Sequence, residues 1–224
     1  MPRRSLLAVL LPVVPLFAQA PSDPALARVA TDVGPYVERQ LREMGIPGAC
    51  VAVLDVDPET GETHQWCEGF GRDGRPGSTG MDSAAIHRVA SISKLFSDTA
   101  AMVLVERGEL DLDAPVSKYL PDFAPHNPFD GEVTLRHLMG HRAGIVREAP
   151  VGHYFDPSEP SLAATVHSLN DTSLVYAPGS AFKYSNPGIG VVGAVVAKVT
   201  GKPFETAVKE LVLDPLELGD SDFR

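Results

Sequence analysis

Ser91 and Lys94 are the first residues whose types and spacing point to chemistry. They stand at the start of a run with helical periodicity that extends to Glu106, and helical residues three apart lie on one face. The lysine ammonium would then lie one turn above the serine hydroxyl and could activate it as a nucleophile. Helix-terminal N–H groups near Ser91 would also stabilise an oxyanion, as acyl transfer requires. The alternative is a serine that only caps the helix, with Lys94 in solvent.

The Ser-x-x-Lys spacing occurs twice, so it is not specific by itself. The second copy, from Ser180 to Lys183, follows Pro178-Gly179 and precedes no helical run. Proline followed by glycine is typical of a turn. We therefore interpret the second copy as a turn and keep Ser91 as the candidate nucleophile.

Tyr184-Ser185-Asn186 is the only Tyr-x-Asn sequence in the chain, and it precedes the apolar run Ile189–Val199. A tyrosine oxygen near a serine and a lysine can act as a general base if the cation lowers its pKa. The Asn186 amide offers both a donor and an acceptor to a substrate amide. The alternative is a core tyrosine beside an asparagine that caps a helix.

Two strands and several helices must position these residues. Hydrophobic periodicity and Gly/Pro boundaries predict an α+β chain with strands in its first part and helices behind. No internal repeat or interdomain linker interrupts it. The predicted helices are Ala25–Met44, Ser91–Glu106, Leu135–Met139, Leu162–Leu169, Ile189–Val199 and Phe204–Leu211, and the predicted strands are Ala49–Val56 and His64–Phe70.

Composition limits the class of protein. The 224 residues are 44% hydrophobic, which is enough to bury a core in one domain of ordinary size and disfavours disorder. The net charge of −10 lacks the basic surface that phosphate-backbone binding needs, so nucleic acid is a poor candidate partner.

Residues 1–20 have the pattern of a secretory signal peptide. Arg3 and Arg4 precede the apolar run Leu6–Phe17, and Ala18-Gln19-Ala20 provides a cleavage site. A membrane anchor is the alternative, but the run is shorter than the roughly 20 residues of a spanning helix, and two prolines interrupt it. Cleavage would take the net charge from −10 to −12. We expect an exported protein, periplasmic or extracellular, with no stable membrane span after cleavage.

Cys50 and Cys67 flank the predicted hairpin Val51–Trp66, so their pairing depends on its register. A four-residue loop over Pro58–Gly61 sets Cys50 opposite Gly69, two places beyond Cys67. A tighter turn would make the cysteines direct partners. Proline first and glycine last favour the longer loop, which predicts free thiols rather than a disulfide.

Several common sites are absent from the sequence. It contains no Gly-x-Ser-x-Gly, His-Glu-x-x-His, Cys-x-x-Cys or Gly-x-x-x-x-Gly-Lys-[Ser/Thr] motif. His137 and His141 are four apart and could bind zinc from one helix face. Gly140 and Gly144 interrupt that helix, however, and the pattern places no third ligand beside them. We interpret these histidines as structural.

The candidate residues belong to an ordered set of four motifs. The motifs are Ser91-Ile92-Ser93-Lys94, Leu110-Asp111-Leu112-Asp113-Ala114-Pro115-Val116, Leu135-Arg136-His137-Leu138-Met139-Gly140-His141-Arg142-Ala143-Gly144 and Tyr184-Ser185-Asn186. In that order they resemble the motifs of the penicillin-recognising serine hydrolases related to class C β-lactamases, and the resemblance extends over nearly all of Ala25–Phe223. Gly45-Ile46-Pro47-Gly48 and Pro178-Gly179 resemble the segments that frame the family's first strand and its tyrosine.

The resemblance implies a helical domain beside an antiparallel sheet flanked by helices, with the active site between them. Ser91 would form an acyl-enzyme, Lys94 and Tyr184 would transfer its proton, and Asn186 would hold the substrate amide. No metal or organic cofactor is implied. The substrate would be a β-lactam, a D-Ala-D-Ala peptide or a small ester, and the motifs do not separate these. A non-catalytic sensor or binding protein of the same fold is the alternative.

The chain departs from the family's pattern in two places. His141-Arg142-Ala143-Gly144 replaces the usual His-Thr-Ser-Gly, and no Lys-Thr-Gly or His-x-Gly segment follows Tyr184. Lys198-Val199-Thr200-Gly201 is not a substitute, because it ends a predicted helix. We therefore expect residues 21–224 to be the N-terminal part of a longer hydrolase domain that lacks its C-terminal strands. By itself this part should hydrolyse negligibly, because one side of the site would be missing.

Overall fold

The computed structural model describes residues 23–76 and 80–223. The chain divides into two units, residues up to Arg88 and residues from Val89 onward. The signal peptide predicted over residues 1–20 lies outside the described residues. Among those residues, no helix is long and apolar enough to cross a membrane.

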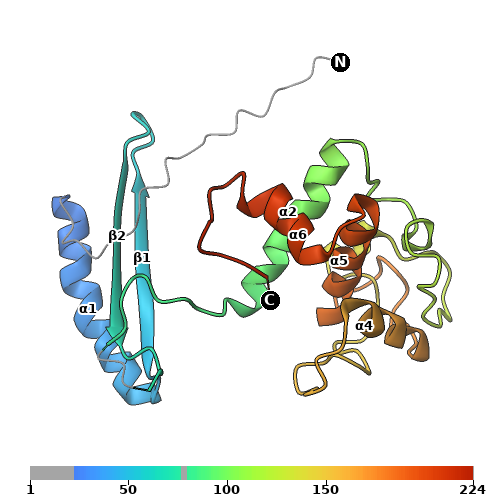
Figure 1. The fold of residues 1–224 in the computed structure, drawn as a ribbon, viewed down its shortest axis with the longest axis horizontal. Coiled ribbons are helices and arrows are strands. Elements are labelled where there is room, and N and C mark those ends of the chain that lie inside the picture. The colour runs from blue at the N-terminus through green and yellow to red at the C-terminus, as the bar shows by residue number, and fades with distance from the viewer. Residues whose placement is uncertain (1–22, 77–79, 224) are drawn as a thin grey trace. The chain divides into compact units, whose positions relative to one another are not determined.

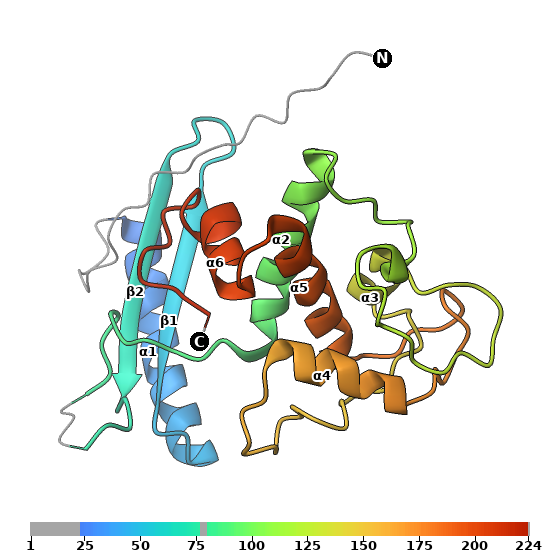
Figure 2. The same ribbon diagram turned by 45° about the vertical axis from the view of Figure 1, so that its right-hand side comes forward.

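The first unit is a helix followed by a hairpin, as the sequence predicted. Helix α1 (Pro24–Met44) precedes strands β1 (Gly48–Val56) and β2 (Thr63–Gly71), which pair antiparallel. Figure 2 shows α1 running along the hairpin. One face of the helix packs on β2, and the buried members of this small core are Leu26, Leu41, Trp66 and Phe70.

The hairpin has the register that the longer loop predicts. The Asp57 N–H donates to the Glu62 carbonyl at 2.9 Å and closes the loop, and Cys50 lies opposite Gly69. The Asp57 carboxylate also accepts backbone N–H groups inside the turn, so the turn sequence stabilises its own conformation. Cys50 and Cys67 are both free, as predicted.

The Cys50 thiol is held by groups of its own unit. Its Sγ donates to the Asp82 carbonyl oxygen at 3.0 Å and lies 3.2 Å from His87 Nε2. Burial, with a smaller contribution from the Asp82 charge, raises the pKa of this thiol. A thiol with a raised pKa has a smaller thiolate fraction than an ordinary cysteine, so Cys50 is a weaker nucleophile than an unperturbed cysteine would be.

The second unit is built from helices. Its first helix begins at Ser93, two residues later than predicted, and its long central helix begins at Asn186, three residues earlier than predicted. A π-helical turn, Lys209–Leu213, follows the last helix. The helices are α2 (Ser93–Glu106), α3 (Leu135–Met139), α4 (Leu162–Ser168), α5 (Asn186–Thr200) and α6 (Phe204–Val208), with 3₁₀ turns at Ala90–Ile92, Val116–Lys118 and Leu169–Asp171.

Helix α5 is the centre of the second unit. It contacts α2, α4 and α6 (Figure 1) and also α3 (Figure 2), so it is buried on nearly every side. A helix in such a position must be apolar all round, which is the composition of its residues 189–197; Lys198, in the last turn, is exposed. Gly201 ends it in a left-handed conformation with φ of +66°, which confirms that Lys198–Gly201 is a helix C-terminus.

The Leu110–Val116 and Leu135–Gly144 motifs lie against each other. Asp113 and Arg136 form a two-point ion pair, with Nε–Oδ1 at 2.6 Å and Nη2–Oδ2 at 2.8 Å, which lowers the pKa of Asp113. Thr134 caps α3 through a reciprocal pair of hydrogen bonds with His137. These contacts fix the segment that leads from α3 to His141.

Candidate active site

Ser91 lies in the 3₁₀ turn that precedes α2, not in the helix itself. Its side chain is exposed, and the preceding residue, Ala90, has φ of +45°. Alanine rarely adopts this left-handed conformation, so the backbone before Ser91 is strained. The residue that caps α2 is Ile92, which makes no side-chain cap hydrogen bond. Ser91 is therefore not a helix cap, and that alternative is wrong.

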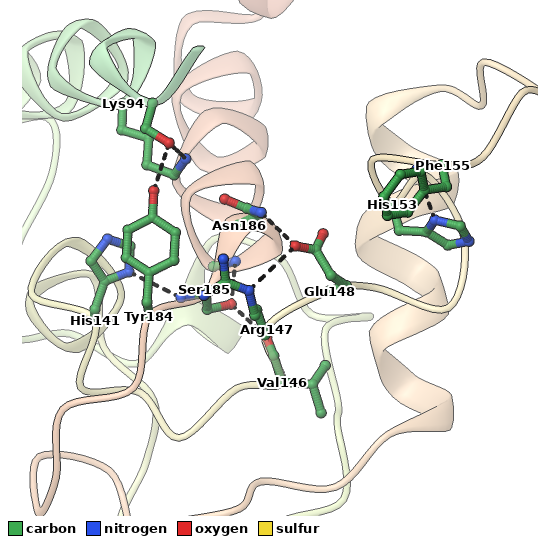
Figure 3. A network of polar contacts seen from close by, with 12 residues as sticks. Lys94, His141, Val146, Arg147, Glu148, His153, Phe155, Tyr184, Ser185 and Asn186 are labelled. Atoms are coloured by element: carbon green, nitrogen blue, oxygen red, sulfur yellow. Dashed lines mark hydrogen bonds and ion pairs between the residues drawn. The ribbon is translucent and has the colours of Figure 1, made fainter. Parts of the chain in front are cut away.

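The three predicted catalytic residues meet at one oxygen atom. Ser91 Oγ accepts a hydrogen bond from Lys94 Nζ at 3.1 Å and another from the Tyr184 hydroxyl at 2.8 Å (Figure 3). Lys94 lies one turn along α2 from Ser91, as the spacing predicted. Tyr184 comes from the segment just before α5, so packing of α2 on α5 brings it within reach.

The second Ser-x-x-Lys copy is a turn, as predicted. The Ser180 hydroxyl donates to the Ala177 carbonyl at 2.7 Å, and the Ser180 N–H donates to the same oxygen. The Lys183 N–H donates to the His141 carbonyl at 2.7 Å. The Lys183 backbone N–H therefore ties the segment before Tyr184 to His141, whereas the Ser180 hydroxyl bonds within its own turn.

Two cations and an imidazole surround the Tyr184 ring. Lys94 Nζ lies 5.1 Å from the ring centroid and Arg147 Cζ lies 5.5 Å from it. The His141 ring lies 4.3 Å from it, tilted by 35°. A hydrogen bond from Lys94, the bond with Ser91, and the charges of Lys94 and Arg147 all lower the pKa of Tyr184. These are the conditions under which a tyrosine can act as a base.

His141 helps to position the tyrosine segment. Its Nδ1 accepts the Ser185 N–H at 3.3 Å, which requires that nitrogen to be unprotonated. Burial and the Lys94 charge lower the pKa of His141, so the imidazole stays neutral. The turn that begins at His141 ends at Gly144, which has φ of +75°, and a Cβ at Gly144 would collide with the Tyr176 carbonyl oxygen. The histidine and the glycine of this motif therefore both have structural roles: His141 accepts a backbone hydrogen bond, and Gly144 adopts a backbone conformation that leaves no room for a side chain.

The backbone that follows this turn is joined to the start of α5. Buried Ser185 caps α5 by accepting the Gly188 N–H at 3.0 Å, and its hydroxyl donates to the Val146 carbonyl at 2.8 Å. The alternative that Asn186 caps the helix is therefore wrong. The Asn186 N–H donates to the Arg147 carbonyl at 3.0 Å. These bonds fix Tyr184 and Asn186 on either side of Ser185.

Replacing Ser185 with alanine should destabilise the second unit by about 1–2 kcal/mol, because the change removes a helix cap and leaves the partly buried Val146 carbonyl without its donor. Urea unfolding followed by circular dichroism measures this. Ser161→Ala is the matched control, since Ser161 is an exposed cap of α4 and should cost about 1 kcal/mol or less. Equal losses in the two variants would contradict the role of Ser185.

Asn186 is held by a residue that the sequence analysis missed. Its Nδ2 donates to Glu148 Oε1 at 2.6 Å (Figure 3), and Arg147 Nε lies 3.9 Å from the same oxygen. The carboxylate accepts only, so it fixes the Asn186 amide with its oxygen turned away from Glu148. Arg147 and Glu148 come shortly after the His141–Gly144 motif, with two residues between, and this closeness was the only sequence signal that could have found them.

Asp98 lies one further turn along α2 from Lys94. It is half-buried, and its Oδ1 has no hydrogen-bond partner among the described residues. Burial raises the pKa of this carboxyl to about 6, against the lowering effect of Lys94. Lys94 therefore hydrogen-bonds the Ser91 hydroxyl, three residues before it, and its charge acts on the carboxyl four residues after it.

The two histidines that could have bound zinc serve the backbone instead. His137 belongs to the α3 capping box, and His141 accepts the Ser185 N–H. Over residues 23–76 and 80–223, no group of three or more histidine, cysteine, aspartate or glutamate side chains could hold a metal ion.

The chain is similar in sequence and fold to known proteins. The family model named Beta-lactamase matches residues 35–224. The chain belongs to the beta-lactamase family. Among curated relatives, esterase EstB of Burkholderia gladioli is 32% identical over 212 residues, which cover 88% of this chain and 52% of EstB. The chain thus spans about half the length of this relative.

Solved structures support the fold class. EstCE1, described as a hydrolase with promiscuous acyltransferase activity, is 27% identical with a TM-score of 0.76 over 87% of this chain and 53% of its own. A class C beta-lactamase has a TM-score of 0.71 at 22% identity, over 89% of this chain and 52% of its own, a likeness of fold alone. The predicted class C β-lactamase-like α+β fold is confirmed.

Proposed function

We propose that this chain carries the nucleophile and the proton-transfer residues of a serine hydrolase that forms an acyl-enzyme on Ser91. One observation carries the proposal: Ser91 Oγ lies within hydrogen-bond distance of both Lys94 Nζ and the Tyr184 hydroxyl. A nucleophile in contact with a base, and a base oriented by further groups, is the usual signature of covalent catalysis. Membership of the beta-lactamase family supports it.

In acylation, ionised Tyr184 takes the proton of the Ser91 hydroxyl while Oγ forms a bond to the substrate carbonyl carbon. The carbonyl electron pair moves to its oxygen and then returns as the bond to the leaving group breaks. The leaving group takes the proton from Tyr184. In deacylation, water loses a proton to Tyr184 and attacks the acyl carbon; the bond from that carbon to Ser91 Oγ then breaks, and Tyr184 returns the proton to Oγ, which restores the serine hydroxyl and the ionised tyrosine. The Lys94 ammonium stabilises the ionised tyrosine and donates to Oγ throughout.

Asn186 is placed to bind the substrate amide or ester chain. Glu148 accepts a hydrogen bond from one N–H of the Asn186 amide, which leaves the other N–H and the amide oxygen for substrate. The names of EstB and EstCE1 favour an ester or another acyl compound. A β-lactam or a D-Ala-D-Ala peptide would use the same acyl transfer, so all three classes belong in the test.

Covalent labelling of the intact, gene-encoded protein tests the proposal. A fluorophosphonate and a fluorescent penicillin should label it, and Ser91→Ala should abolish the label. Rapid loss of the penicillin label would show turnover, whereas a stable label without hydrolysis of any ester, peptide or β-lactam would indicate the non-catalytic sensor instead. Equal labelling of Ser91→Ala, or no labelling by either reagent, would contradict the proposal.

We also propose that the protein is exported and is cut after Ala20. The basic start, the apolar run and the Ala-x-Ala sequence support this. N-terminal sequencing of the protein recovered from its native cells should begin at Pro21. A sequence beginning at Met1 or Pro2 would contradict export by cleavage.

A further inference from the structure

Arg147 contacts the same ring as the catalytic lysine. Its guanidinium carbon lies 5.5 Å from the centroid of the Tyr184 ring, and Lys94 Nζ lies 5.1 Å from that centroid (Figure 3). The Arg147 side chain is about two-thirds exposed, so hydrophobic burial does not explain its position. A planar cation over an aromatic face is a favourable contact.

The backbone determines this placement. The Arg147 carbonyl accepts the Asn186 N–H at 3.0 Å, and the neighbouring Val146 carbonyl accepts the Ser185 hydroxyl at 2.8 Å. Both donors come from the two residues that follow Tyr184. These two bonds involve backbone carbonyls, so they fix the main chain of residue 147 beside the tyrosine segment independently of its side chain. The Arg147 guanidinium therefore extends from a fixed point of the backbone.

We propose that Arg147 is a positioning residue of this site, whose guanidinium holds Tyr184 in the ionised form that takes the proton of Ser91. The inference rests on the proposed function. A cation near an acid stabilises its charged form, and the effect acts through the tyrosine and not on the substrate. The Arg147 charge contributes to the lowered pKa of Tyr184, after the larger contributions of Lys94 and Ser91.

The other polar groups around the ring limit the size of this effect. Lys94 and Ser91 face the tyrosine hydroxyl from α2 and the turn before it, and neutral His141 covers the ring. Glu148 lies on the same segment as Arg147, with its Oε1 3.9 Å from Arg147 Nε. Its negative charge offsets part of the Arg147 charge, so we expect a moderate contribution.

The test is the pH profile of kcat/KM for p-nitrophenyl acetate with the intact, gene-encoded protein. The profile should rise with pH as Tyr184 loses its proton. In Arg147→Gln the midpoint of this rise should move to higher pH by about 0.5–1 unit. Below the midpoint kcat/KM should fall by about 3- to 10-fold, and well above it the variant should equal the wild type.

Two further variants separate charge from structure. Arg147→Lys keeps a cation and should keep the midpoint near that of the wild type. Arg39→Gln removes an arginine that lies 5.3 Å from another tyrosine ring, that of Tyr36 on α1, and should change nothing. An equal loss of activity at every pH in Arg147→Gln, or an unmoved midpoint, would overturn the inference.

A direct titration keeps this inference separate from the proposed function. NMR of ¹³Cζ-labelled tyrosine, with Tyr184 assigned by its loss in Tyr184→Phe, measures the tyrosine pKa without turnover. A higher pKa in Arg147→Gln supports the inference, and an unchanged pKa overturns it. Turnover that persists in Ser91→Ala would count against the proposed function alone.

Discussion

Replacing Ser91 with alanine is expected to lower kcat/KM by on the order of 10⁴- to 10⁶-fold, because the acyl-enzyme can no longer form. The substituted side chain is exposed, so the fold should not change. The intact, gene-encoded protein should be assayed with p-nitrophenyl acetate and with nitrocefin. Unfolding by heat should show the same midpoint as the wild type.

The second Ser-x-x-Lys copy supplies the control for this prediction. Ser180→Ala removes a serine with the same lysine spacing but in a turn, where its hydroxyl bonds only the Ala177 carbonyl in the described structure. Its kcat/KM should stay within about twofold of the wild type, since surface substitutions cost little. Comparable losses of kcat/KM in the two variants would show that the contacts of Ser91 with Lys94 and Tyr184 do not contribute to catalysis.

Replacing Tyr184 with phenylalanine should lower kcat/KM by about 10²- to 10⁴-fold, the usual contribution of a general base. The change removes one oxygen and keeps the ring that packs on His141. The pH profile gives a second readout. Tyr184 must lose its proton to act, and its pKa lies below the ordinary 10.0, so wild-type activity should rise with pH through a midpoint under 10.0. This rise should be absent from Tyr184→Phe.

Tyr176→Phe is the control, because Tyr176 belongs to the same unit and is nearly half-exposed. It should keep both the rate and the pH profile of the wild type. If Tyr184→Phe lowered the rate but kept the same rise with pH, another group would be the base. Lys94 would then be the first candidate, since it is the other side chain in contact with Ser91 Oγ.

Local sequence signals predicted most of the fold. Periodicity located α1 and the helices of the second unit, and the Pro58–Gly61 turn predicted the pairing of Cys50 with Gly69. These features depend on neighbours in the chain, which is why single-sequence reasoning reaches them. The start of α2 was predicted two residues early, because nothing about alanine indicates the left-handed backbone of Ala90.

The site was predicted in part for a similar reason. Ser91, Lys94, Tyr184 and Asn186 stand in ordered motifs, and the structure brings the first three into contact. Arg147 and Glu148 stand in no such pattern. Their places follow from hydrogen bonds with Asn186, which lies 39 positions after Arg147 and 38 after Glu148, and such tertiary contacts leave no mark on local periodicity.

The mass of the trapped intermediate tests the central claim most directly. The intact, gene-encoded protein is mixed with a slowly released penicillin or an activated ester, quenched in acid and digested for mass spectrometry. The account predicts one added acyl group, located on Ser91. An acyl group on Ser93, Lys94 or Ser180, or hydrolysis that proceeds with no acylated peptide in Ser91→Ala and wild type alike, would contradict it.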